Sequence, residues 1–170
     1  MKITLDALLQ SRDKRAAYQR YLLGEYPGKT LLCLTVVMPG EVKRNLYSLV
    51  VAQAAVSALI ARFGSDIIHA ETCDLPTGYE AYLLTSMPLR DAKRAVCHIE
   101  DSHPLGRLFD IDVIAPDGIP LSRQEVGEPM RKCLLCDNEA RFCMRNHTHS
   151  TEELTARIQK MVQDYADSDE

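Results

Sequence analysis

The sequence predicts an α+β fold, because its apolar residues recur with the two-residue period of strands in some segments and with the 3.6-residue period of helices in others. The predicted core elements follow one another as strand, helix, strand, strand, helix and strand. This order is the βαββαβ arrangement of ferredoxin-like folds, in which both helices cover one face of the sheet and the other face stays open. A small mixed sheet of the nucleotidyltransferase type has the same elements, and the pattern does not separate the two. N-terminal helices are expected before this core, and a cysteine-containing loop and a helix after it.

The chain begins with a segment, residues 4–23, that is predicted to be helical in two pieces. Ser11 has the side chain of an N-cap and would start the second piece, which Gly24 ends. Residues 31–38 then form an unbroken apolar run rich in branched side chains, which is typical of a buried strand. The turn Pro39-Gly40 ends this strand.

The middle of the chain supplies the other elements of the predicted core. An amphipathic helix begins near Lys43, and a second helix begins at Pro88. Two strands, residues 66–74 and 79–86, lie between these helices and are joined by a hairpin turn. Near the C-terminus, the capping-box sequence S-T-E-E at residues 150–153 predicts the start of a last helix.

Residues 107–115 form the predicted strand that follows the second core helix. The alternation of this segment places Asp110 and Asp112 on one side and apolar residues on the other. Two carboxylates at this spacing have roots about 7 Å apart and suit one hard cation such as Mg²⁺. An acidic pair on a solvated strand face is also common, and this alternative stays open. If the apolar side meets the helices, Asp110 and Asp112 face solvent or a second layer, where a charged substrate can reach them.

Basic residues accompany the acidic pair. His103 and Arg107 lie just upstream of it, and such cations oppose the charge that a phosphate brings. Lys43 stands at the predicted start of a helix, where backbone N–H groups and a lysine side chain together form an anion site. A solvated first turn of the helix is the plainer interpretation of Lys43. The pattern therefore favours a ligand that carries phosphate groups.

Length and composition limit the class of protein. At 170 residues the chain is long enough for one domain, residues 1–170, and too short for two ordinary ones. The net charge of −4 argues against nucleic acid as the main partner, although a local cationic cluster can still bind a small anion. No apolar run approaches the roughly 18 residues of a membrane-spanning helix, and residues 1–4 do not resemble the start of a signal peptide. We therefore expect a cytoplasmic protein without a membrane partner.

The cysteines form a second informative group. Without a secretory signal, the six cysteines are expected to be reduced thiols or metal ligands. Cys133 and Cys136 form a C-x2-C pair, and Cys143 and His147 follow at spacings that could complete a Zn²⁺ site with three cysteines and one histidine. A redox-active pair is disfavoured because the motif follows a loop. Three reduced cysteines that pack a loop-rich segment remain the alternative.

Several stretches of the sequence match one known family in combination. The most specific is S-H-P-L-G-R-L-F-D-I-D-V at residues 102–113, and the block T-V-V-M-P-G-E-V-K at residues 35–43 supports it. The other matching positions are Ser11-Arg12-Asp13, Ser122-Arg123, the R-K-C-L-L-C sequence at residues 131–136, Cys143 and Arg145. With these residues, the chain resembles the apo-citrate lyase phosphoribosyl-dephospho-CoA transferase, or holo-citrate lyase synthase, family.

The resemblance implies transfer of 2'-(5''-triphosphoribosyl)-3'-dephospho-CoA onto a serine of the citrate lyase acyl carrier (gamma) subunit, with release of diphosphate. This is nucleotidyl-type transfer, with a serine hydroxyl as the nucleophile. Asp110 and Asp112 would bind Mg²⁺, and one of them could also take the serine proton. The residues expected to bind phosphates are Arg107, His103, Lys43, Arg12 and Arg123.

The docking of the partner is a separate expectation, and two alternative functions remain open. An acidic carrier subunit is expected to dock on a basic patch, for which the candidates are Arg12, Lys14, Arg15 and Arg20. One alternative function is a zinc-stabilised interaction module without catalysis. Another is the same transfer chemistry on the carrier subunit of the related malonate decarboxylase system.

Overall fold

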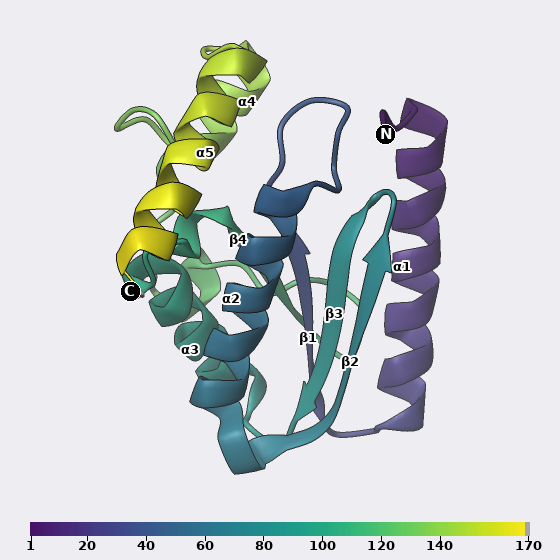
Figure 1. The fold of residues 1–170 in the computed structure, drawn as a ribbon. Helices are drawn as coiled ribbons and strands as arrows, with labels where there is room; N and C mark the ends of the chain where they lie inside the picture. Colours follow the sequence, from purple (N-terminus) through teal and green to yellow (C-terminus); the bar gives the residue numbers. More distant parts are fainter. Residues whose placement is uncertain (169–170) are drawn as a thin grey trace.

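The structure, a computed structural model that describes residues 1–168, combines a four-stranded antiparallel sheet with five α-helices in that range (Figure 1). The α-helices are α1 (Leu5–Glu25), α2 (Leu46–Phe63), α3 (Leu89–Ser102), α4 (Ala140–Asn146) and α5 (Thr151–Ser168). The strands are β1 (Thr30–Val36), β2 (Ile67–Leu75), β3 (Gly78–Thr85) and β4 (Phe109–Ile114). Short 3₁₀ turns cover Gly64–Asp66, Gly106–Leu108 and Gln124–Val126. The predicted α+β class and the predicted order of the core elements are confirmed.

The strands lie in the order β2-β3-β1-β4, and each neighbouring pair is antiparallel. The central strand β1 pairs with β3 on one side, where Leu34 lies opposite Ala81. On its other side it pairs with β4, where Leu34 lies opposite Ile111. The strand β4, which carries the acidic pair, therefore forms one edge of the sheet.

One face of the sheet packs against α2 and α3 and forms the main core. Leu32 and Leu34 of β1 lie in this core with Ile111 and Val113 of β4. The helices contribute apolar side chains of their buried faces, among them Val51, Ala55, Leu59, Val96 and Ile99. This arrangement confirms that the apolar side of β4 meets the helices, which leaves its acidic side on the opposite face.

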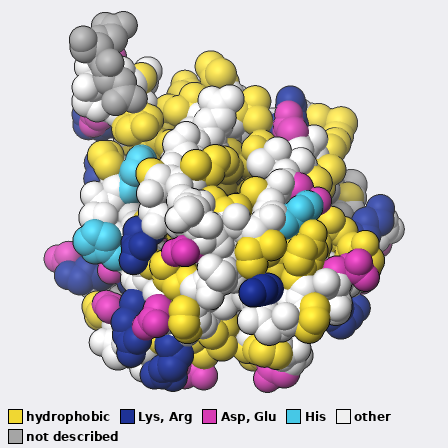
Figure 2. Space-filling view, turned by 90° about the horizontal axis from the view of Figure 1, so that it is seen from below, with side chains coloured by type: hydrophobic (Ala, Val, Ile, Leu, Met, Phe, Trp, Pro, Cys, Tyr) yellow, Lys and Arg dark blue, Asp and Glu magenta, His cyan; other side chains and the backbone are white. Residues whose placement is uncertain are grey.

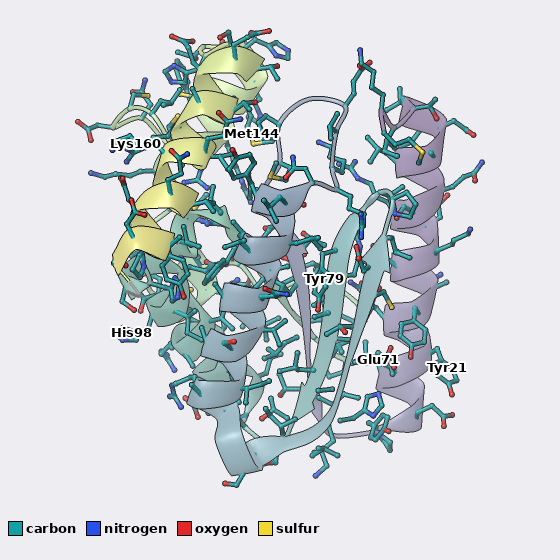
Figure 3. All side chains as sticks on the ribbon, in the orientation of Figure 1. Tyr21, Glu71, Tyr79, His98, Met144 and Lys160 are labelled. Carbon is teal, nitrogen blue, oxygen red and sulfur yellow. The ribbon has the colours of Figure 1, made fainter. Side chains whose placement is uncertain are left out.

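That opposite face is partly covered, contrary to the expectation of an open face. The helix α1 runs beside the β2–β3 hairpin (Figure 1), and its Leu22 packs with Leu31, Tyr82 and Leu84 in a second, smaller core. The ring of Tyr18 meets that of Tyr82 edge-on at 5.0 Å. Figure 3 shows α1 running along this hairpin, with Tyr21 on the helix and Glu71 on β2. The face remains accessible on the side of β4.

Helix boundaries differ from the sequence expectation at two sites. The helix α1 is continuous, and Ser11 lies buried inside it with its hydroxyl 3.0 Å from that of Thr77 on the β2–β3 turn. The helix α2 begins at Leu46 after an Asn45 capping box, so Lys43 precedes the helix and does not form its first turn. The C-terminal capping box is confirmed, because Glu153 accepts a hydrogen bond from the Ser150 N–H at 2.8 Å.

One segment exceeds the apolar length that the sequence analysis allowed. Residues Leu46–Asp66 are long and apolar enough, by length and composition alone, to cross a membrane. Core helices of globular proteins pass the same test, and this helix buries Val51, Ala55 and Leu59 against the sheet. The expectation that no run approaches a spanning length was therefore wrong for α2, whose apolar face serves the core.

Charged side chains of both signs are mixed on the face of the molecule seen in Figure 2, where apolar patches separate them. No continuous basic field covers this face.

Candidate active site

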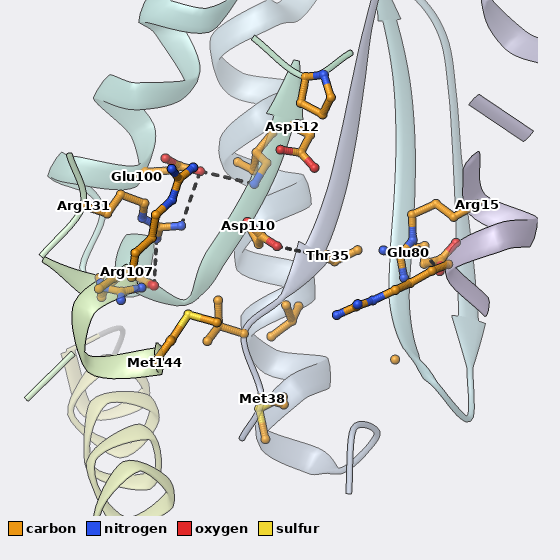
Figure 4. Close-up of a pocket in the computed structure, with 18 of the residues that line it drawn as sticks. Arg15, Thr35, Met38, Glu80, Glu100, Arg107, Asp110, Asp112, Arg131 and Met144 are labelled. Carbon is orange, nitrogen blue, oxygen red and sulfur yellow. Dashed lines mark hydrogen bonds and ion pairs between the residues drawn. The ribbon is translucent and has the colours of Figure 1, made fainter. Parts of the chain in front are cut away.

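The acidic side of β4 opens into a hollow with a volume of about 600 Å³. Its walls come from α1, the end of β1, the turn between β2 and β3, the acidic face of β4, and the loops that follow β4. Figure 4 shows the acidic residues near the middle of this pocket, with basic side chains on either side. Residues far apart in the sequence, from Leu8 to Met144, line it.

Asp110 and Asp112 both line the pocket, as the strand alternation predicted. Asp110 is exposed, and its carboxylate accepts a hydrogen bond of 3.1 Å from the hydroxyl of Thr35, its cross-strand neighbour. Asp112 is half-buried and lies opposite Cys33. The antiparallel ladder between β1 and β4 thus fixes the backbone beneath both carboxylates.

The surroundings of Asp112 disfavour its charged form. Burial, and after it the neighbouring carboxylates of Asp110 and Glu100, raise the pKa of Asp112 to about 6, although Lys93 and Arg15 act in the opposite direction. An anion in such a position lacks enough compensating positive charge. Asp112 is therefore a site where a bound cation would be stabilised.

The donor set fits a hard divalent cation. Two carboxylates on one strand face, with the Thr35 hydroxyl beside them, offer the oxygen ligands that Mg²⁺ prefers. Such a cation usually takes one or two protein carboxylates and completes its coordination with water and substrate phosphates. The two carboxylates face the open pocket. A cation bound to them would therefore also be accessible to a phosphate oxygen.

Arg107 and Arg131 form a cationic pair at the end of the pocket where β4 begins (Figure 4). Arg107 Nε donates to the carbonyl of Lys132 at 2.6 Å, and Arg131 donates to the carbonyl of Arg107 at 2.8 Å. Burial, together with the charge of Arg131, lowers the pKa of Arg107. Two guanidinium groups held together in this way attract an anion.

Lys43 and Arg12 form a second cationic pair in the pocket wall. Lys43 Nζ donates to the carbonyl of Met38, and burial followed by the charge of Arg12 lowers the pKa of Lys43. Arg12 comes from α1 and is exposed. Lys43 therefore stands in a loop before α2, and the cation beside it comes from α1.

Arg15 also enters the pocket from α1, but its charge is paired inside the protein. Its Nε donates to the carboxylate of Glu80 at 2.9 Å, and Glu80 also accepts a hydrogen bond from the hydroxyl of Tyr82. Glu80 is buried on β3. Of the four residues of the expected basic docking patch, Arg12 and Arg15 line the pocket, whereas Lys14 and Arg20 lie exposed on α1.

Arg123 also lines the pocket, but carboxylates surround its guanidinium. It is buried, and its Nη2 donates to Glu100 at 2.7 Å and to Asp101 at 3.0 Å. Its Nε is the buried side-chain atom without a hydrogen-bond partner among the N and O atoms of residues 1–168. The second carboxylate oxygen of Glu100 accepts the backbone N–H of Ile111 at 3.2 Å. Arg123 is thus engaged in holding the edge of β4.

His103 lies away from the pocket. Its ring packs between Phe109, at a centroid distance of 4.8 Å, and Tyr165 of α5, at 5.5 Å. Its Nδ1 accepts the backbone N–H of Leu105 at 3.0 Å. The structure therefore brings Asp110, Asp112, Arg107, Lys43, Arg12 and Arg123 to one pocket and leaves His103 in the packing between β4 and α5.

Sequence reasoning missed several charged residues of the pocket, among them Lys93, Glu100 and Arg131. Lys93 and Glu100 are 6% and 7% exposed, although they belong to the otherwise amphipathic helix α3. They stand seven residues apart with Cys97 between them, which places all three on one stripe of the helix. A charged stripe on the buried side of a helix was the available signal.

The cysteine group assembles with a different histidine from the one expected. The ligand atoms of Cys133, Cys136, Cys143 and His149 all lie within 4.8 Å of one another. His147 instead ends α4 in a left-handed conformation with a φ of 46° and is exposed. This turn reverses the chain, so that the histidine two residues later reaches the thiols. The structure thus brings the three predicted cysteines together, and the histidine that lies with them is His149 and not the expected His147.

Comparison with known proteins identifies the family. The family model described as apo-citrate lyase phosphoribosyl-dephospho-CoA transferase matches residues 3–165. A protein of Streptococcus pyogenes serotype M18, named as a probable transferase of this kind, is 36% identical over 98% of this chain and 89% of its own length. One of Escherichia coli O9:H4, with the same name without "probable", is 39% identical over 95% of this chain and 90% of its length. Protein CitXG of Haemophilus influenzae is 36% identical, and the match covers 96% of this chain but 36% of that longer protein. The chain belongs to the apo-citrate lyase phosphoribosyl-dephospho-CoA transferase family.

Proposed function

We propose that the protein transfers 2'-(5''-triphosphoribosyl)-3'-dephospho-CoA to a serine of the apo-citrate lyase acyl carrier (gamma) subunit and releases diphosphate. The name of the family indicates the transferred group and the citrate lyase acceptor. The observation that supports the chemistry is that two carboxylates on β4 share one pocket with the Arg107–Arg131 and Lys43–Arg12 pairs. Such a pocket suits a triphosphate that approaches together with a cation.

The acidic pair would hold the metal. Asp110 and Asp112 present carboxylate oxygens that fit Mg²⁺, which when bound would neutralise charge on the transferred phosphate and on the departing diphosphate. The serine Oγ would attack the α-phosphorus as the bond to the diphosphate oxygen breaks. The serine proton would pass to one of the two carboxylates. This step makes a phosphodiester between the carrier and the dephospho-CoA derivative.

The cationic residues would position the donor. Phosphoryl transfer depends on alignment and on neutralisation of the leaving oxygens more than on covalent chemistry by the protein. Arg107 and Lys43 lie half-buried on separate parts of the wall, so they can contact different phosphates of one chain. Arg12 and Arg131 would add charge beside them, and Arg123 would act indirectly by holding Glu100 against β4.

The carrier subunit would approach the mouth of the pocket along α1. Arg12 lines the pocket from this helix, and Lys14 and Arg20 are exposed on the same helix outside it. A row of cations that leads to the pocket favours the approach of an acidic partner. We further propose cytoplasmic action, since the carrier and the donor would both be soluble components.

The fold supports the ferredoxin-like alternative over the mixed-sheet alternative. The chain order of the core elements, the strand order β2-β3-β1-β4 and the antiparallel pairing agree with a split β-α-β sheet with its two helices on one face. In this arrangement α1 and the segment after β4 would be additions that build the pocket on the second face.

The acceptor can be tested directly. The purified enzyme is incubated with Mg²⁺, the triphosphate donor, and either the apo-carrier of citrate lyase or that of malonate decarboxylase, and each carrier is then weighed by mass spectrometry. We expect the citrate lyase carrier to gain the mass of the phosphoribosyl-dephospho-CoA group, and a Ser→Ala carrier to gain none. Modification of the malonate decarboxylase carrier alone would overturn the proposed acceptor. No transfer to either carrier by a folded enzyme would overturn the proposed reaction.

A further inference from the structure

The cysteine group lies in residues 131–149, a segment whose backbone is arranged around it. An antiparallel bridge joins Lys132 to Glu139, and the N–H of Cys133 donates to the carbonyl of Asn138 at 2.7 Å. This small hairpin brings the two cysteines of the C-x2-C pair to its tip. Cys143 follows on the short helix α4 and faces them.

The distances within the group match a tetrahedral metal site. Cys136 Sγ lies 3.4 Å from Cys143 Sγ and 3.4 Å from His149 Nε2. A tetrahedron with Zn–S bonds of about 2.3 Å and Zn–N bonds of about 2.0 Å has edges of roughly 3.5–3.8 Å. The four ligand atoms, all within 4.8 Å of one another, therefore need only small shifts to surround one ion.

We propose that Cys133, Cys136, Cys143 and His149 bind one structural Zn²⁺ ion. Three thiolates and one imidazole form a closed donor set that leaves no coordination position for water or substrate, which is the mark of a structural site. The backbone N–H of Leu135 points to Cys133 Sγ at 3.5 Å, the kind of contact that stabilises a metal-bound thiolate. Soft sulfur ligands also select zinc over the Mg²⁺ proposed for β4.

The ion would hold one wall of the pocket in place. The segment between the ligands supplies Arg141 and Met144 to the pocket (Figure 4 labels Met144), and Arg131 precedes Cys133 by two residues. Arg107 donates to the carbonyl of Lys132, so the cationic pair is tied to the hairpin that carries the first two ligands. A segment with one largely buried thiol and few apolar anchors gains its order from the metal.

Metal content tests the site without any substrate. Tag-free protein purified under reducing conditions is analysed by inductively coupled plasma mass spectrometry, and we expect one zinc per chain. Cys136→Ser and His149→Ala should reduce the zinc content at least tenfold. The matched controls are His147→Asn, which keeps a residue that tolerates a left-handed conformation, and Cys73→Ser, which removes a thiol outside the group. Both controls should retain one zinc per chain.

A second measurement does not depend on variants that fold. The wild-type protein reconstituted with Co²⁺ should show the intense visible absorption of tetrahedral cobalt and a thiolate-to-cobalt charge-transfer band. Three results would each overturn the proposal. They are substoichiometric zinc after reconstitution with Zn²⁺, octahedral cobalt spectra, and a Cys136–Cys143 disulfide that persists in protein purified under reducing conditions. Equimolar zinc in both ligand variants would do the same.

The consequence for substrate rests on the proposed function and is measured separately. Zinc removal should raise the KM for the triphosphate donor more than it lowers kcat, and should speed proteolysis within residues 131–149. An enzyme that contains zinc but transfers nothing would contradict the transferase account alone. An enzyme that binds no zinc on reconstitution yet transfers the group would contradict the metal site alone.

Discussion

Glu100 accepts a hydrogen bond from the backbone N–H of Ile111, 3.2 Å from its Oε1, on the outer edge of β4. Ile111 lies between Asp110 and Asp112, so this contact fixes the backbone that carries both carboxylates. The other carboxylate oxygen of Glu100 accepts from Arg123 at 2.7 Å. An edge strand otherwise leaves such N–H groups unpaired, and here a buried carboxylate and its counter-ion occupy that position.

Loss of the Glu100 charge should destabilise the protein. Glu100→Gln keeps an acceptor for Ile111 but leaves the buried Arg123 guanidinium without its closest anion, at a cost of about 3 kcal/mol in the free energy of unfolding. Asp101→Asn is the control, because Asp101 binds the same guanidinium with a side chain that is half exposed, and should cost less than about 1 kcal/mol. Urea unfolding of both variants measures the difference. Equal losses would remove the special role of Glu100.

The Asp112 carboxylate should lower the free energy of unfolding of the metal-free protein. The pKa of Asp112 is raised from 3.8 to about 6, so the folded protein retains a proton that the unfolded chain loses as pH rises through this window. Stability therefore falls between about pH 4 and pH 6, and the penalty is complete above pH 6. In metal-free buffer at pH 7.5, Asp112→Asn should stabilise the protein by on the order of 1–3 kcal/mol.

The stability gain from Asp112→Asn should shrink at pH 5, where much of the Asp112 carboxyl is already protonated in the folded protein. Asp117→Asn, an exposed substitution in the turn after β4, provides the control and should change stability little at either pH. Thermal unfolding at the two pH values gives the comparison. A destabilised Asp112→Asn protein at pH 7.5 would show that the carboxylate is compensated in the metal-free fold.

The half-buried cations should govern binding of the donor. Arg107→Gln and Lys43→Gln each remove one charge-assisted contact to phosphate, worth about 1.5–3 kcal/mol, which corresponds to a roughly 10- to 100-fold higher KM for the triphosphate donor. Arg62→Gln changes an exposed arginine on α2 outside the pocket and should leave KM unchanged. Steady-state kinetics measures the donor KM of each variant, and circular dichroism confirms that each variant is folded. Unaltered donor KM in both pocket variants would exclude them from phosphate binding.

Gly106 is required by close packing at the start of β4. A Cβ at this position would lie 2.3 Å from the carbonyl oxygen of Glu100, which is backbone and cannot yield as a side chain does. Gly106→Ala should therefore destabilise the protein by about 2 kcal/mol or more, through displaced backbone beside the acidic pair. Gly24→Ala, with no atom within 4 Å of its added Cβ, should be neutral or stabilising by up to about 1 kcal/mol. Thermal unfolding of the two alanine variants measures the contrast.

The sequence predicted those features that local periodicity determines. The alternation of residues 107–115 placed Asp110 and Asp112 together correctly, because side chains of one strand alternate regardless of the rest of the fold. Periodicity does not determine which long-range partner a charge finds. Arg123 was expected at a phosphate, and the structure pairs it with Glu100 and Asp101.

Two further differences have the same origin. His103 lies next to the acidic strand in sequence, but the 3₁₀ turn before β4 directs it towards Phe109 and Tyr165. The spacing of the cysteine group allowed either histidine, and the left-handed residue at the end of α4 selects His149. The position of α1 over part of the second sheet face could not be predicted from periodicity either. The apolar pattern of a helix does not indicate which face of a sheet the helix packs against.

Transfer by the Asp110→Asn/Asp112→Asn double variant tests the central claim most directly. Neither carboxylate lies in the apolar core, so circular dichroism and urea unfolding should report a folded protein. With Mg²⁺, donor and apo-carrier present, intact-mass spectrometry should detect no phosphoribosyl-dephospho-CoA on the carrier, whereas Asp117→Asn should modify it at the wild-type rate. A double variant that loads the carrier at a rate close to wild type would contradict the account.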